Sequence, residues 1–204
     1  MFRICTAVLI LTLSAVSAKF SDAQCSTLSA SSTTDELAGL LRSSRDVPED
    51  QRDRECINFA LQQLSYRRAP EAAPILVDYL DFQRPLTEAE EAGAAFHGGG
   101  RRSIAGMYPA TGALMQAGQV AVPALLSAIT THDSRLIRRN ATFTIMQIYR
   151  TQPVEAIQRM KAEEAKLARG TGQASLKDAI RNAVQWCEDN LRAKCESAAA
   201  GAMP

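Results

Sequence analysis

The chain has 204 residues, which is enough for one domain with a sizeable hydrophobic core. Its 23 basic and 22 acidic side chains leave a formal net charge of +1, which argues against a nucleic-acid-binding protein that works through bulk charge. Alanine and leucine are frequent and aromatic residues make up only 5%, so the composition favours helices over sheets.

The first residues have the features of a secretory signal. An apolar run over 4–18 follows Arg3, and small residues at 16–18 and 21–23 offer two cleavage sites. The run is short for a membrane-spanning helix. We therefore expect 1–23 to be a signal peptide and 24–32 a flexible leader, in a secreted or periplasmic protein with no membrane attachment after cleavage. An uncleaved anchor is the alternative.

Helix-start signals recur from residue 33 onwards, and no stretch shows the two-residue alternation of a strand. Thr33 and Glu36 have the spacing of a capping box. The later predicted starts are 46–49, 70–74, Thr87 with Glu90, Pro109, Pro123, Asp133, Pro153 and Ser175 with Asp178. The sequence therefore predicts an all-α domain of about eight helices over 33–197, followed by a disordered tail over 198–204.

Three prolines lie inside apolar stretches, where proline normally interrupts a helix. Proline lacks an amide hydrogen, and its ring holds φ near the helical value, so the first helical turn accommodates it without loss. We expect Pro74, Pro123 and Pro153 each to open a helix after a tight turn. The predicted unit is a helix, a turn and a proline-opened helix.

This unit recurs along the chain. Residues 113–129 align without gaps to residues 144–160 at an offset of 31, and residues 60–80 follow the same design with a longer turn. Paired helices with a period in the thirties are typical of a solenoid.

The stretch "GQVAVPALLSAI" (118–129) resembles the second helix of HEAT repeats, especially the short bacterial type found in phycobilisome lyases. The resemblance covers roughly residues 53–169 in about three units. The Asp-Pro turn of the short repeats is missing, and an inserted loop or short helix over 82–108 interrupts the spacing. The resemblance implies an α-solenoid of stacked antiparallel helical hairpins that binds another macromolecule on a helix-lined face. A compact bundle with vestigial repeats is the competing interpretation.

Export determines how the cysteines are interpreted. Cys5 would leave with the signal, so Cys25, Cys56, Cys187 and Cys195 remain and predict two disulfides in an oxidising compartment. Three pairings are open, and we favour the local pairs Cys25–Cys56 and Cys187–Cys195. A straight helix would hold the last two about 12 Å apart, too far to bond, so this pairing requires a helix break near 189–190.

Paired arginines are the candidate partner-binding residues. We expect Arg67 with Arg68, and Arg138 with Arg139, to lie near helix ends and to select an acidic partner segment. The resulting prediction is a non-catalytic scaffold that binds a protein or peptide. The sequence leaves the oligomeric state open.

The glycine-rich stretch 97–103 is the alternative site. It contains His97, Arg101 and Arg102, and it is interpreted either as a connector, as an anion or partner contact, or as the site of an enzyme or lyase-like accessory. An esterase would need the motif G-x-S-x-G to hold its nucleophilic serine, and the sequence does not contain this motif. His97 and His132 have no second ligand at helical spacing and are expected in solvent-facing loops, so we predict no metal and no cofactor.

Residues 140–142 satisfy an N-glycosylation sequon.

Overall fold

The computed structural model describes residues 28–88, 90–91 and 103–200. These residues form helices and no strand, which confirms the prediction of an all-α chain with about eight helices. The α-helices are α2 (Thr34–Arg45), α3 (Arg54–Arg67), α4 (Ala73–Leu76), α6 (Ile104–Met107), α7 (Pro109–Ala117), α8 (Val122–Thr131), α9 (Arg135–Ile148), α10 (Pro153–Glu164) and α11 (Thr171–Ala200). Four 3-10 turns accompany them: η1 (Glu49–Gln51), η2 (Pro70–Ala72), η3 (Val77–Tyr79) and η4 (Gly118–Ala121).

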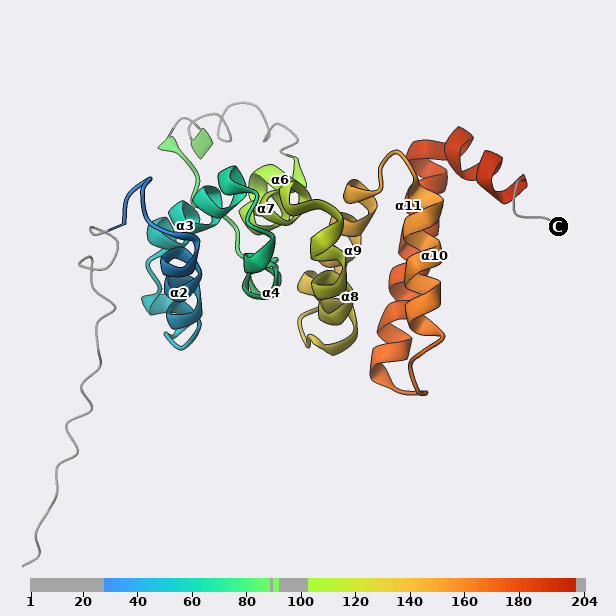
Figure 1. Cartoon of the computed structure of the whole chain (residues 1–204), viewed down its shortest axis with the longest axis horizontal. Helices are drawn as coiled ribbons and strands as arrows, with labels where there is room; N and C mark the ends of the chain where they lie inside the picture. Colours follow the sequence, from blue (N-terminus) through green and yellow to red (C-terminus); the bar gives the residue numbers. More distant parts are fainter. Residues whose placement is uncertain (1–27, 89, 92–102, 201–204) are drawn as a thin grey trace, which may run out of the picture.

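The helices are arranged in a row, with α2 and α3 at one end and α10 and α11 at the other (Figure 1). α3 packs on α7, α7 on α9, and α9 on α11, while α8 contacts both α9 and α11. Each helix therefore contacts mainly its neighbours in the row. The buried side chains still form one continuous cluster from Leu37 in α2 to Cys187 in α11.

Proline opens the helices where the sequence predicts it. Pro74, Pro109, Pro123 and Pro153 all lie at the first or second position of their helices, α4, α7, α8 and α10. The predicted stop at Gly118 is also confirmed, because this glycine ends α7 with a φ of 72°, a conformation that other residues rarely adopt. At Thr33 both hydrogen bonds of the capping box are present.

Two helices begin later than predicted because a better cap follows the predicted one. The start predicted at 46–49 is only the turn η1, and α3 begins at Arg54, after Asp53 accepts a hydrogen bond of 2.9 Å from the Cys56 amide. At α9 the cap is Ser134 rather than Asp133. In both places the side chain that reaches the free amide three residues on determines the start.

The last helix begins earlier than the predicted Ser175. α11 starts at Thr171 and crosses close to the end of α8 at Gly172, where a Cβ atom would lie 3.0 Å from the Thr130 carbonyl oxygen. Glycine allows this close approach, because a Cβ atom would crowd the Thr130 carbonyl and the end of α8 would have to shift slightly.

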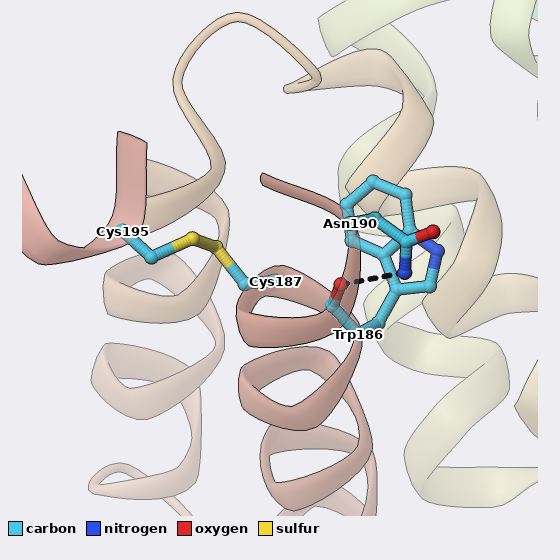
Figure 2. The surroundings of a disulfide bond; sticks show 4 residues. All are labelled: Trp186, Cys187, Asn190 and Cys195. Atoms are coloured by element: carbon cyan, nitrogen blue, oxygen red, sulfur yellow. Dashed lines mark hydrogen bonds between the residues drawn. A yellow bond between two sulfur atoms is a disulfide. The ribbon is translucent and has the colours of Figure 1, made fainter. Parts of the chain in front are cut away.

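The predicted pair Cys187–Cys195 is a disulfide (Figure 2). Its Cα atoms are 6.2 Å apart, and α11 departs from helical geometry at Leu191, next to the predicted break at 189–190. Cys56 is also disulfide-bonded, whereas Cys25 lies outside the described residues. Disulfides are typical of an oxidising compartment.

The inserted segment is tied together near its two ends. The Arg84 amide donates to the Met107 carbonyl over 3.1 Å, and the Arg84 side chain donates to the Gly106 carbonyl and forms an ion pair with Glu90. Thr87 and Glu90 exchange the predicted capping hydrogen bonds. Residue 84 therefore lies beside residues 106–107, although it is 22 positions from residue 106 in sequence.

One long apolar stretch of the described residues contributes to the core. Residues Pro109–Thr131 reach a mean hydropathy of 1.4 and are long enough by composition to cross a membrane. In the structure Gly118 and η4 divide them into α7 and α8, and Leu114 and Leu125 are fully buried in the common core. Their hydropathy is explained by this packing.

Candidate functional site

The two central proline-opened helices form the walls of a groove. α4 and α8 lie side by side in the row (Figure 1), and the turns before them, η2 and η4, contact each other. The groove between them has a volume of 550 Å³. Its lining residues are Pro70, Glu71, Ala73, Pro74, Val77, Asp78, Val120, Pro123, Ala124, Ser127, Ala128, Thr131 and His132.

The groove has mainly apolar walls, with Glu71 at one end and Asp78 and His132 at the other. Pro74 and Pro123 face it from opposite walls, and Val120 beside them is 68% exposed. Asp78 and His132 lie where the two walls end. This arrangement provides apolar surface for a partner's side chains together with a few polar contacts, which is the usual composition of a binding site.

The charged end is a network that joins three elements. Arg45 at the end of α2 forms an ion pair of 2.5 Å with Asp78, and the His132 Nε2 atom lies 4.0 Å from the second oxygen of that carboxylate. Burial raises the pKa of Asp78, while the positive charge of Arg45 opposes this rise. The groove end is therefore built from partly buried, mutually paired groups.

His132 does not lie in a solvent-facing loop as the sequence suggested. Its side chain is 25% exposed at the C-terminal cap of α8, and its Nδ1 atom accepts a hydrogen bond of 3.1 Å from the Ser134 amide. Because Nδ1 is an acceptor and Nε2 faces Asp78, neither nitrogen offers a free lone pair to a substrate. The geometry favours a role in holding the groove end together over proton transfer.

The structure does not bring the predicted arginine pairs together. Arg67 and Arg68 end α3, where Arg67 donates to the Ala30 carbonyl over 2.7 Å and Arg68 adopts a φ of 53°. Arg138 and Arg139 lie in the first two turns of α9, and α7 packs between α9 and α3 in the row (Figure 1).

Arg138 and Arg139 instead share a pocket with two arginines that the sequence analysis missed. This pocket has a volume of 250 Å³ and lies between the first two turns of α9 and residues 175–182 of α11, with Arg135 and Arg181 in its lining. Arg135 could have been found from its position one helical turn before Arg139. Arg181 could not, because it reaches the pocket only through the packing of α11 on α9.

The glycine-rich stretch is described only at its end. His97, Arg101 and Arg102 lie outside the described residues, and Ser103 caps α6 by accepting a hydrogen bond of 3.0 Å from the Gly106 amide. Among the described residues, no group of three histidine, cysteine, aspartate or glutamate side chains could hold a metal ion.

The sequon at 140–142 has a structural role in the folded chain. Asn140 is fully buried, and its side-chain amide donates to the Leu80 carbonyl over 2.6 Å, which ties α9 to the end of η3. An attached glycan would have to replace this contact. The sequon is therefore not an accessible modification site in the folded protein.

Comparisons with protein-family models, with curated proteins and with solved structures found no significant match to this chain.

Proposed function

We propose that this protein is an exported, HEAT-like repeat scaffold that binds a peptide segment of a protein partner without catalysis. Two features support the repeat assignment: the recurring unit of a helix, a turn and a proline-opened helix, and the row of helices that contact mainly their neighbours. The disulfides at Cys187–Cys195 and Cys56 support export.

The observation that carries the binding role is the apolar groove between α4 and α8. It is lined from both walls by proline and aliphatic side chains, and Val120 exposes two thirds of its surface there. Burial of a partner's apolar side chains against these walls contributes roughly 25 cal/mol for each Å² removed from water. Clefts lined mainly by apolar side chains with a few polar groups are the usual form of a binding site.

The charges along the groove define the partner segment. Asp78 is already paired with Arg45, whereas Glu71 at the other end has no counter-charge among the described residues. A lysine or arginine of the partner would satisfy this carboxylate. The proposed occupant is therefore an extended peptide with apolar side chains and one basic residue.

Site-specific photocrosslinking tests this proposal. A benzophenone amino acid at position 120 in the full chain, expressed in its native compartment, should capture a discrete protein, and mass spectrometry should map the adduct to an apolar segment next to a lysine or arginine. The matched control carries the probe at Tyr66, which is 79% exposed and lies outside the groove. Equal adducts at both positions would contradict the proposal.

A substitution provides the second test. Val120→Glu places a charge in the apolar part of the groove without disturbing the core, so partner capture should fall at least about tenfold while the thermal unfolding midpoint stays unchanged. Tyr66→Glu should change neither quantity. Full partner retention by Val120→Glu would show that the groove is not the binding surface.

A further inference from the structure

The first two turns of α9 and residues 175–182 of α11 enclose a concentration of positive charge. The pocket between them is lined by four arginines: Arg135, Arg138, Arg139 and Arg181. Asp178 is the one carboxylate in its lining. The remaining lining residues are Thr142, Ser175, Ala179 and Asn182. Asp178 pairs with Arg181 over 3.2 Å, and both side chains are exposed. Three arginines are therefore left without a carboxylate partner in this pocket.

The arginines differ in how firmly they are held. Arg138 is half-buried, and its Nη1 group donates to the carbonyl oxygens of His132 and Asp133, each over 2.7 Å. These contacts hold the guanidinium in place, and its Nε and Nη2 groups donate to no other described residue. Arg135 and Arg139 are exposed and have no hydrogen bond or ion pair with the described part of the chain.

The charge distribution of α9 opposes its own stability. A helix is stabilised by acidic residues at its start and basic residues at its end, and α2 follows this rule with Asp35 and Glu36 in its first turn and Arg42 and Arg45 in its last. α9 has no acidic residue in its first turn and no basic residue in its last, and its cations lie at the start.

Two arginines of α9 also repel each other. Arg135 and Arg139 are four residues apart on one helix face, where like charges are neighbours. A negatively charged ligand would reduce this repulsion. It would also compensate the unfavourable placement of positive charges at the start of α9. The arrangement is therefore accounted for by binding rather than by stability.

We propose that the pocket defined by Arg135, Arg138, Arg139 and Arg181 binds an acidic peptide segment. Guanidinium groups bind carboxylates through paired N–H donors, and the cations here come from two helices on opposite sides of the pocket, so they can engage more than one carboxylate of an extended chain. This site is separate from the groove between α4 and α8 and does not depend on it.

Calorimetric titration with a hexaglutamate peptide at low salt tests the proposal. The full mature chain should bind this probe, whereas a hexaglutamine peptide should not bind, and added sodium chloride should weaken the binding. Arg139→Gln should weaken it about tenfold. The control Arg150→Gln removes the same charge from an exposed position outside the pocket and should leave the affinity unchanged.

A stability measurement separates a binding role from a structural one. Without peptide, Arg139→Gln should unfold at a higher temperature than the wild-type chain, because one repelling cation is gone, and Arg150→Gln should not. A lower midpoint for Arg139→Gln would show that the arginine stabilises the fold and would overturn the proposal.

The remaining outcomes also decide the question. Equal loss of affinity in Arg139→Gln and Arg150→Gln, equal affinity for inorganic phosphate alone, or no binding of hexaglutamate would each overturn the assignment of an acidic-peptide site. Val120→Glu should bind hexaglutamate as the wild-type chain does, so failure of the groove proposal and failure of this one are distinguishable.

Discussion

Tyr79 shows how one buried polar residue links stability to pH. Its side chain is 3% exposed, and its hydroxyl donates to the Leu41 carbonyl over 2.5 Å, which ties η3 to α2. Burial raises the pKa of Tyr79 from 10.0 to about 12, against the opposing positive charges of Arg52 and Arg45. The protonated phenol is thus the form that the folded state favours.

A folded-state pKa above the unfolded value gives stability that is complete below pH 10 and is lost as pH rises towards 12. We expect urea unfolding to show a loss of roughly 2 to 3 kcal/mol across this range from Tyr79. Tyr79→Phe should cost about 1 kcal/mol at pH 8 and should lack this part of the alkaline loss. The two chains differ only at position 79, and every other tyrosine, including Tyr149, is present in both. Parallel curves of stability against pH would therefore refute the assignment of the alkaline loss to Tyr79.

Asn140 shows why residue-level motifs need tertiary context. The sequon is a three-residue pattern and carries no information about burial, whereas the contact from Asn140 to Leu80 spans 60 residues. His132 is similar, because its environment depends on Asp78 in a different element. Neither outcome follows from local sequence.

At the scale of elements, α11 contains the clearest constraint. The Cys187–Cys195 disulfide spans eight residues and lies across the bend at Leu191, next to the hydrogen bond from the Asn190 side chain to the Trp186 carbonyl (Figure 2). A straight helix would separate these cysteines by about 12 Å, so the bend and the disulfide require each other. Trp186 packs against the core beside them and reports on this region.

Removing this disulfide should release the bend. For a Cys187→Ser/Cys195→Ser double variant we expect a loss of about 2.5 kcal/mol in the free energy of unfolding, from the greater freedom of the unfolded chain, together with a shift in Trp186 fluorescence. The measurement is urea unfolding followed by fluorescence, with Cys56→Ser as the control for the other disulfide. An unchanged free energy and an unchanged spectrum would show that the bend forms without the disulfide.

Most helix starts could be predicted because their causes are local. A capping side chain or a proline acts on amides within one turn, so Thr33, Pro74, Pro123 and Pro153 were interpretable from sequence alone. The start of α11 was predicted too late, at Ser175 instead of Thr171. The starts of α3 and α9 were predicted too early, because the capping residues Asp53 and Ser134 follow the predicted ones.

At the scale of the whole molecule, the row of helices predicts an elongated particle. A compact chain of about 180 residues has a radius of gyration of about 16 Å. If the helices stack as a HEAT-like array, small-angle X-ray scattering of the mature chain should give a larger radius and an asymmetric pair-distance distribution. A radius near 16 Å with a symmetric distribution would favour the compact bundle with vestigial repeats.

Helix content, proline-opened turns and the local Cys187–Cys195 pair follow from the order of residues, because each depends on groups a few positions apart. The groove between α4 and α8, the paired state of His132 and the arginine pocket between α9 and α11 depend on which distant helices lie side by side. Helices become neighbours because their apolar faces are buried against each other. Hydrophobic burial is non-directional, so the sequence of one helix does not show which other helix it packs against.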